Sequence, residues 1–400
     1  EKEAGNVVDK IIHYSTGMPE VMGNWRNVIS LIADDEDSNL HLEDAEELAS
    51  VISALNEGIN VEKIYLDAYK QASTPGGERY PEANADINRR VARGALLINY
   101  VGHGGETGWA HESILQISDI TSWDNMDNMP VFVTATCEFS RFDDPGRISG
   151  GEYVLLNPKG GGIALFTTTR ATYAGSNSAL NQRFYEYAIT RTEDGYLRMG
   201  DIMRLSKMDA GSNENGRKFI LMGDPALKIA FPEYFIQATH INNQPISAAS
   251  DTIKALSEVT ISGRIVDAEG NLYSDYQGVL FPTVFDKPTS ISTLGNDPGS
   301  YTRSFLIQNN ILYKGKASIT NGQWSFTFIA PKDLAYQYDF GKISLYAHNG
   351  ITDAAGFNHD VIMGGYNENA LPDLAGPSID LFINDTNFVS GGITDENPVL

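Results

Sequence analysis

Two residues of this 400-residue chain combine reactive side chains with informative positions. Cys137, the single cysteine, directly follows the apolar run 130–136 (PVFVTAT). His103 follows the run 95–101 (ALLINYV) within a Gly-His-Gly-Gly sequence. An imidazole can remove the proton of a thiol and later protonate a leaving amine. The pair therefore predicts nucleophilic attack on a carbonyl carbon.

The backbone beside both residues could stabilise the oxyanion that such an attack creates. We expect the N–H groups of Gly104 and Cys137 to be the donors, and loss of one donor typically costs on the order of 10²–10³ in rate. Each residue alone also has an ordinary structural interpretation. A lone cysteine is most often a small buried residue, and His103 could be a loop histidine on a tight turn. Their common position at strand ends favours catalysis.

Three apolar runs, 95–101, 130–136 and 162–168, are bounded by turn residues. Continuous apolar runs of this length are typical of strands that are buried on both faces of a parallel sheet. Helical patterns alternate with them, so we predict a three-layer α/β domain with a mainly parallel sheet. Ligands bind at the carboxyl ends of such strands. If the first two runs are neighbours, His103 and Cys137 face each other there.

The pattern changes after Phe231-Pro232, where alternation with a period of two replaces helical periodicity. Trp324, Phe326 and Phe328 alternate after the hairpin dipeptide Asn321-Gly322. Short strands with regular turns predict an immunoglobulin-like β-sandwich. The expected organisation is an α/β domain over 1–231 that lacks its N-terminal part, a β-sandwich over 232–370, and the truncated start of a further β-rich domain over 371–400.

Composition excludes several classes of protein. The 29 basic and 52 acidic residues give a net charge of −23, and we find no basic cluster that could bind nucleic acid. One cysteine rules out intramolecular disulfides and cysteine-rich metal sites. His103 and His111 are not in a zinc-binding spacing, so we expect no catalytic metal and no required cofactor. The acidic run Asp34–Asp37 could hold a structural Ca²⁺, although a solvated acidic loop is the simpler interpretation.

Three motifs carry a resemblance to a known family. The stretches YVGHGGETGWA (Tyr100–Ala110), TCEFSRFD (Thr136–Asp143) and LMGDPALKI (Leu221–Ile229) resemble the gingipain family of cysteine peptidases. The resemblance implies a caspase/gingipain-like fold for the first domain, with His103 as the base and Cys137 as the nucleophile. It also implies an upstream acid that orients the histidine, for which Glu46 is our candidate and Asp44 the alternative.

Within that family, the chain looks most like the PorU-type sortases of the type IX secretion system of Bacteroidetes. That resemblance implies cleavage of the C-terminal signal domain of exported proteins and transfer of the new carboxyl end to water or to an amine of surface lipopolysaccharide. It further implies a secreted or outer-membrane surface location and other outer-membrane secretion components as partners. Two alternatives stay open, namely a plain secreted endopeptidase and a catalytically silent surface scaffold or adhesion protein.

Overall fold

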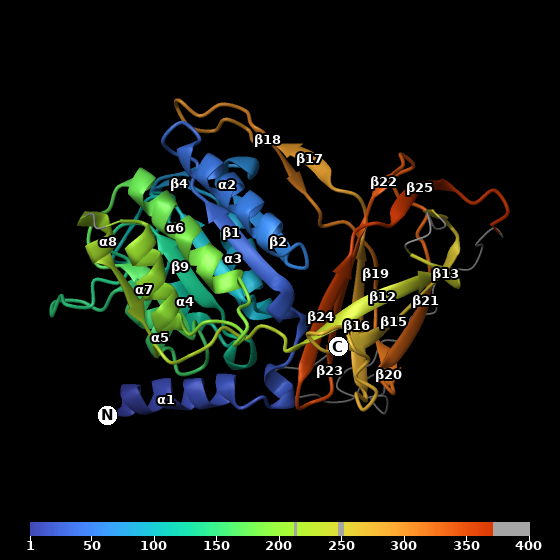
Figure 1. Ribbon diagram of the computed structural model, residues 1–400. Coiled ribbons are helices and arrows are strands. Elements are labelled where there is room, and N and C mark those ends of the chain that lie inside the picture. The colour runs from blue at the N-terminus through green and yellow to red at the C-terminus, as the bar shows by residue number, and fades with distance from the viewer. Residues whose placement is uncertain (212–213, 247–251, 371–400) are drawn as a thin grey trace, which may run out of the picture. The chain divides into compact units, whose positions relative to one another are not determined.

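The first region of the protein is built on a six-stranded sheet with the strand order β11-β10-β9-β5-β1-β2. Figure 1 shows the computed structural model, which describes residues 1–211, 214–246 and 252–370. All pairings in this sheet are parallel except that of β10 with β11, so the predicted mainly parallel sheet is confirmed. The strands of this sheet are β1 (Val28–Ala33), β2 (Asn60–Tyr65), β5 (Leu97–Val101), β9 (Val131–Ala135), β10 (Ala164–Thr168) and β11 (Phe219–Met222).

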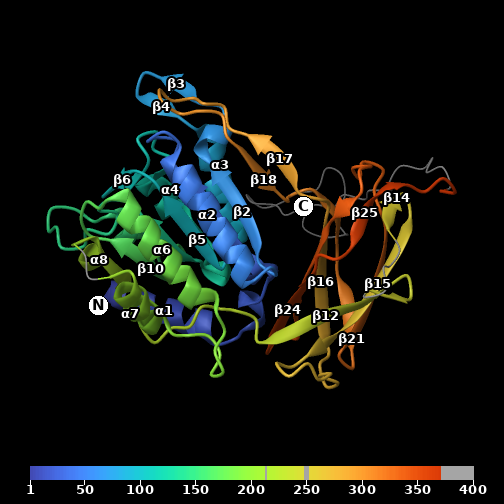
Figure 2. The ribbon, with the colours of Figure 1, turned by 45° about the horizontal axis from the view of Figure 1, so that its top comes forward.

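Helices cover both faces of this sheet, which gives the expected three layers (Figures 1 and 2). One buried cluster joins Leu31 and Val133 to residues of α2, α6 and α7, and a second joins Ile98 and Phe132 to residues of α3, α4 and α5. The helices are α1 (Lys2–Ser15), α2 (Leu40–Leu55), α3 (Pro81–Arg93), α4 (Ile117–Ser122), α5 (Gly150–Leu156), α6 (Ala174–Ile189), α7 (Met199–Asp209) and α8 (Glu214–Lys218).

The predicted strands lie where the apolar runs placed them. The runs 95–101, 130–136 and 162–168 contain β5, β9 and β10, and every residue of these three strands is buried. Small hairpins decorate the region outside the main sheet. They are β3 (Ala72–Thr74) with β4 (Gly77–Arg79), and β6 (Gly104–Gly105), β7 (Gly108–Trp109) and β8 (Leu115–Gln116).

The second region is a closed barrel, which corrects the expected immunoglobulin-like sandwich. Seven strands pair in the order β12-β15-β21-β20-β16-β23-β24, and β12 also pairs with β24, so the ring closes. They are β12 (Tyr234–Ile241), β15 (Glu258–Val266), β16 (Gly278–Phe285), β20 (Ala317–Thr320), β21 (Gln323–Ile329), β23 (Lys342–His348) and β24 (Asp353–Asn358). Sandwiches and barrels both bury alternate residues, so alternation alone could not distinguish them.

The predicted alternation itself is confirmed, because Trp324, Phe326 and Phe328 of β21 are buried while their neighbours are exposed. Additional strands extend from the barrel. They are β13 (Gln244–Pro245), β14 (Ile253–Ala255), β17 (Thr289–Ser292), β18 (Ser304–Ile307), β19 (Ile311–Lys314), β22 (Asp339–Phe340) and β25 (Ile362–Tyr366). Residues Glu1–Tyr366 form one compact unit. The further β-rich domain expected over 371–400 lies outside the described residues.

We call β17, β18 and the loop 293–303 between them the arm. The arm leaves the barrel and contacts the α/β region (Figure 2). The Asp67 carboxylate accepts hydrogen bonds from the N–H groups of Gly295 and Asn296 at 2.9 and 2.7 Å. Phe305 of β18 is 4% exposed and belongs to a hydrophobic core of the α/β region. The barrel therefore contributes both polar and apolar contacts to the region that carries the predicted chemistry.

Candidate active site

The sheet register places His103 and Cys137 at the same level. Strands β5 and β9 are parallel neighbours, and Val101 pairs with Ala135 in a register of 34 residues. His103 and Cys137 are separated by the same 34 residues, so each lies two positions beyond its strand end. Neighbouring strands are about 4.8 Å apart. The expected juxtaposition of these two strand ends is therefore present in the fold.

The backbone of His103 is held from both sides. Its N–H donates to Asp34 Oδ2 at 2.7 Å, and its carbonyl accepts from the Tyr100 hydroxyl at 2.5 Å and from the Ala110 N–H at 2.9 Å. Asp34 is the first residue after β1, the other neighbour of β5. The groups that fix this loop thus come from the end of β1, from β5 and from the residue after β7.

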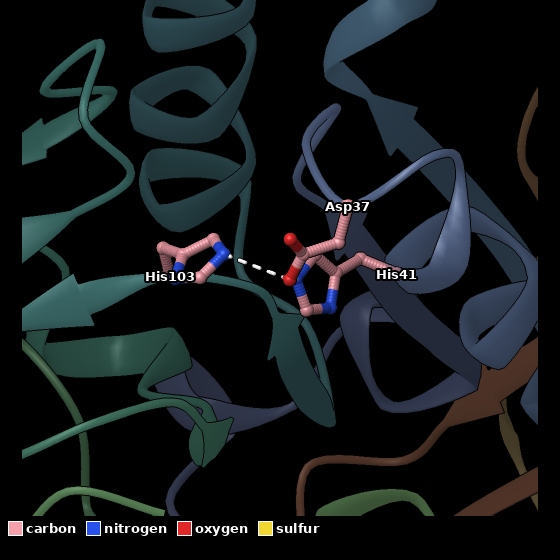
Figure 3. A group of neighbouring side chains, drawn as sticks. All are labelled: Asp37, His41 and His103. Carbon is pink, nitrogen blue, oxygen red and sulfur yellow. Dashed lines mark hydrogen bonds and ion pairs between the residues drawn. The ribbon is translucent and has the colours of Figure 1, made fainter. Parts of the chain in front are cut away.

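Two acidic residues of the loop after β1 contact the imidazole of His103, and Figure 3 shows one of them, Asp37. The imidazole Nε2 lies 3.0 Å from Asp37 Oδ2 and 3.4 Å from Glu36 Oε2. The ring of His41 meets the ring of His103 edge-on at a centroid distance of 5.3 Å, and Asp37 Oδ2 also lies 3.5 Å from His41 Nε2. Burial and the nearby His103 lower the pKa of His41 to about 4, so His41 is neutral at pH 7.

Asp37 lies beside His103 in a turn with an unusual backbone conformation. Asp37, Ser38 and Asn39 all have positive φ angles, of 56°, 56° and 67°. Such angles are costly for residues with a Cβ and persist only where the surroundings fix them. The Asn39 side chain provides that fixation, because it donates to the Tyr301 carbonyl at 2.7 Å and accepts from the Tyr301 N–H at 3.0 Å. The arm of the barrel therefore holds the turn that carries Asp37.

The structure does not bring Glu46 to His103. Glu46 lies within α2, where its carboxylate accepts from the Tyr65 hydroxyl at 2.7 Å and pairs with Lys63 Nζ at 2.6 Å. Asp44, the alternative, is partly buried and interacts with Ser178, and burial raises the pKa of its carboxyl. The acids that reach the imidazole come from the turn ahead of this helix. The acidic run directly after an apolar strand was the signal that could have identified Asp37.

Hydrogen bonds connect the loop that carries Cys137 to the end of β10. Thr168 Oγ1 donates to the Thr136 carbonyl at 2.5 Å, and the Ser140 N–H donates to the Thr168 carbonyl at 2.9 Å. The partly exposed Cys137 Sγ accepts from the Thr172 N–H at 3.4 Å and lies 3.7 Å from the Thr172 carbonyl oxygen. The thiol therefore bonds to Thr172 rather than to His103. Catalytic hydrogen bonds are often loose before substrate binds.

The two predicted oxyanion donors lie on adjoining backbone segments. A Cβ atom on Gly104 would lie 2.6 Å from Thr136 Oγ1, so only glycine allows this close approach to the residue before Cys137. Among the described residues, no acceptor receives a hydrogen bond from the Cys137 N–H. The β6–β7 hairpin also lines a cavity of about 510 Å³, which Gly104 and His111 border.

A second group of acids lies beside the histidine loop. Burial raises the pKa of Asp34 to about 6, that of Asp35 to about 9 and that of Glu112 to about 7, each against its usual value near 4. Oxygen atoms of these three residues lie within 4.8 Å of one another, as do ligand atoms of the group Asp37, His41 and His103. Both groups have the donor atoms of a metal site.

Comparison with known proteins identifies the family. A family model described as peptidase family C25 matches residues 1–230. The chain therefore belongs to peptidase family C25, the gingipain family of cysteine peptidases. Residues 1–230 form a gingipain-family cysteine peptidase domain, and proteins are its class of substrate.

Solved structures provide the second comparison. The chain is similar to the Arg-specific cysteine proteinase gingipain R (RgpB), at 16% identity and a TM-score of 0.48, over 89% of this chain and 72% of that one. It is also similar to dimeric latent PorU from Porphyromonas gingivalis, at 18% identity and a TM-score of 0.35, over 91% of this chain and 45% of that one. No curated protein matches at a significant level. Within the described part of the chain, no helix is long and apolar enough to cross a membrane.

Proposed function

We propose that this protein is an active cysteine endopeptidase in which Cys137 is the nucleophile and His103 is the base. The observation that carries the proposal is the common register of the two strand ends, which sets both residues at one level on neighbouring strands. Membership of a cysteine peptidase family supports it. A scaffold that had lost its chemistry would need neither residue.

The contacts of the imidazole support a different role for each of its two nitrogen atoms. Because Nε2 is engaged by Asp37 and Glu36, Nδ1 is the atom left to exchange a proton with the thiol. Asp37 has the shorter contact, so in our proposal it replaces Glu46 as the residue that orients His103. A carboxylate at Nε2 stabilises the imidazolium that forms when the thiol is deprotonated.

The reaction then follows from these assignments. The Cys137 proton passes to His103, the thiolate sulfur bonds to the carbonyl carbon, and the carbonyl π electrons move to oxygen. The N–H groups of Gly104 and Cys137 donate to this oxyanion. When it collapses, the C–N bond breaks, His103 protonates the departing amine, and a thioester remains. Water or an amine attacks the thioester, His103 takes its proton, and the thiolate leaves.

We extend the proposal to a sortase activity on the basis of the sequence motifs. Its substrates would be exported proteins that carry a C-terminal secretion signal, and its acyl acceptor would be water or an amine of surface lipopolysaccharide. The location would be the secreted or outer-membrane surface compartment, with other outer-membrane secretion components as partners. A thioester supports both outcomes, because only the acceptor that resolves it differs between hydrolysis and transpeptidation.

The test of the catalytic pair is the rate at which iodoacetamide alkylates Cys137 at pH 7, followed by intact mass. We expect His103→Ala to slow alkylation at least about tenfold, because the variant lacks the group that accepts the thiol proton. His240→Ala is the matched control, since His240 is an exposed histidine of the barrel. Equal rates in wild type and His103→Ala would contradict the proposal and favour the scaffold.

A second assay distinguishes the two enzymatic outcomes. The wild-type protein is incubated with an exported protein that carries its C-terminal signal, with and without an added primary amine. An amide at the new carboxyl terminus identifies a transpeptidase, whereas a free carboxylate alone identifies a plain endopeptidase. No cleavage by a protein with a reactive Cys137 would contradict the sortase proposal for this substrate class.

A further inference from the structure

The strand pairs fix the ends of β5 and β9, but both reactive residues lie beyond the last pair, Val101 with Ala135. We call residues 102–116 the histidine segment and residues 136–150 the cysteine segment. A displacement of about 1 Å between reacting groups can lower a rate on the order of 10²-fold. Contacts that join the two segments therefore bear directly on catalysis.

Glu106, in the turn between β6 and β7, connects the two segments. Its Oε1 accepts a hydrogen bond from Arg141 at 2.7 Å, and its Oε2 lies 3.0 Å from Arg147 Nε. Its carbonyl oxygen accepts from the Gly150 N–H at 2.6 Å. Both segments lie wholly within the described residues, and every hydrogen bond or ion pair that joins one to the other ends at Glu106.

The surroundings of the Glu106 carboxylate strengthen these contacts. The side chain is 11% exposed, so water screens its ion pairs less than it screens pairs on the surface. Hydrogen bonds between charged partners are also roughly twice as strong as those between neutral groups. The cysteine segment thus holds both the side chain and the main chain of Glu106.

Short connections link Glu106 to each reactive residue. On one side, the Ala110 N–H donates to the His103 carbonyl at 2.9 Å and closes the hairpin that has Glu106 in its turn. On the other side, the Arg141 N–H donates at 3.2 Å to the carbonyl of Glu138, the residue directly after the proposed nucleophile. Movement of either segment would therefore alter the contact at Glu106.

The third donor lies at a tightly packed helix start. Helix α5 begins at Gly150, and the Gly151 N–H donates to the Phe139 carbonyl at 2.8 Å. A Cβ atom on Gly150 would lie 2.5 Å from a ring carbon of Phe139, so only glycine allows this approach. A displacement of the helix start would also displace the residues that follow Cys137.

We infer that Glu106 is a positioning residue that sets the separation of the His103 imidazole and the Cys137 thiol. It acts through Arg141 and Gly150 rather than through contact with the reacting atoms. The inference rests on the proposed function, because it concerns the pair of residues on which the proposed mechanism depends. An ion pair with only a structural role would change stability and leave the reactivity of the folded protein unaltered.

The first measurement is the rate at which iodoacetamide alkylates Cys137 in Glu106→Ala between pH 6 and pH 9. At pH 7 the variant should react about fivefold more slowly than the wild type, because the imidazole is no longer held where it accepts the thiol proton. At pH 9 the thiol ionises without a base, so the two rates should agree within about twofold.

The second measurement is the cleavage of fluorogenic peptides. Glu106→Ala should lower kcat about tenfold and leave KM within about twofold, because the lost interaction affects the reacting groups more than substrate binding. Arg141→Met removes the other side of the same contact and should cause a similar loss, which keeps the inference testable if Glu106→Ala does not fold. The double variant should lose little more than the larger single loss, as expected for residues that act as one unit.

Glu62→Ala is the matched control. The Glu62 carboxylate pairs with Arg90 at 2.5 and 2.7 Å on β2, the outer strand of the same sheet, so this variant loses an arginine–carboxylate pair away from both segments. It should keep the wild-type kcat and the wild-type dependence of alkylation on pH.

Two results would overturn the inference. One is a wild-type kcat and alkylation profile in both Glu106→Ala and Arg141→Met. The other is a loss no larger than that of Glu62→Ala and explained by the unfolded fraction alone. If His103→Ala still slows alkylation, either result overturns the role of Glu106 and leaves the proposed function in place. Equal alkylation of His103→Ala and the wild type would overturn both.

Discussion

The two regions of the molecule use their strands in different ways. In the α/β region the parallel strands β1, β5 and β9 end at one edge of the sheet, and polar residues follow each of them: Asp34, His103 and Cys137. In the barrel, buried aromatic residues fill the interior, and Phe326 stacks on both Trp324 and Phe328. A parallel sheet brings the ends of distant segments to one place, whereas the closed barrel has its own core and contacts the turn that carries Asp37 through its arm.

The largest expected effect is the loss of peptide cleavage when the proposed nucleophile of the α/β region is removed. Cys137→Ala removes the nucleophile, so peptide cleavage should fall on the order of 10⁴-fold or more. The melting temperature should stay within a few degrees of the wild type, because a partly exposed side chain is shortened by one atom. Cleavage of a fluorogenic peptide library and thermal unfolding measure the two quantities. Residual activity close to that of the wild type would mean that another residue is the nucleophile.

The second prediction concerns the stability of the barrel core. Phe326 of β21 is 5% exposed and stacks on Tyr313 at a ring-centroid distance of 5.4 Å. Phe326→Ala should lower the free energy of unfolding by about 3–5 kcal/mol, because it removes a buried ring and leaves a cavity. Denaturant unfolding measures this loss, and the rate of Cys137 alkylation per folded molecule should not change. A large change in that rate would mean that the barrel core and the active site are coupled.

Acid should destabilise the α/β region through His41. The pKa of His41 is about 4 in the folded protein because of burial and the neighbouring His103, and 6.5 in the unfolded chain. The unfolded state therefore binds a proton that the folded state does not between these values, so stability falls as the pH drops from 6.5 towards 4. The loss is about 3 kcal/mol over the full window.

The measurement is urea unfolding at pH 7 and pH 4 in three proteins. In His41→Phe, which cannot take up the proton, the loss of stability on acidification should be smaller than in the wild type by this amount. His240→Phe changes an exposed barrel histidine and should lose as much stability as the wild type. Asp37, Glu36 and His103 are the titratable groups that face His41. Equal losses of stability in all three proteins would show that His41 has the same pKa in the folded and the unfolded state, which would contradict this prediction.

The smallest of the four effects sharpens the assignment of the orienting acid. Asp37→Asn keeps the size of the side chain but removes the charge that faces Nε2 of His103, so peptide cleavage should fall about 10²-fold. Glu36 remains near the ring at 3.4 Å, which is why the effect is smaller than loss of the nucleophile. Glu46→Gln is the control and should change cleavage less than twofold. A larger loss of cleavage in Glu46→Gln than in Asp37→Asn would identify Glu46 as the residue that orients His103.

The sequence alone predicted what depends on local pattern. The strands β5, β9 and β10 were identifiable because each is a continuous apolar run that ends at a glycine, a cysteine or a polar turn. The shared spacing of 34 residues made His103 and Cys137 a plausible pair before their register was known. Each strand and each reactive residue was identifiable from a few consecutive residues, and only their pairing required the longer spacing.

The features that were missed depend on contacts between distant segments. The acidic run after β1 marks a group of candidate acids, but it does not single out Asp37, because the turn of three left-handed residues that places Asp37 at His103 is stabilised by Tyr301 of the arm. The resemblance to the gingipain family, which implies an upstream orienting acid, pointed to Glu46 instead. Barrel closure rests on two residue pairs between β12 and β24, which no local alternation can indicate.

The arm also determines when the turn that carries Asp37 can be fixed during synthesis. Asn39 and its partner Tyr301 are 262 residues apart, so the loop that carries Asp37 waits for the arm to be synthesised before its turn is fixed. At about 5–20 residues per second, that interval is roughly 13–50 s. During this time the α/β region can fold around its own core while its histidine still lacks an anchored acid. If the proposed mechanism holds, a nascent chain would have no anchored Asp37 beside His103 until Tyr301 had been made.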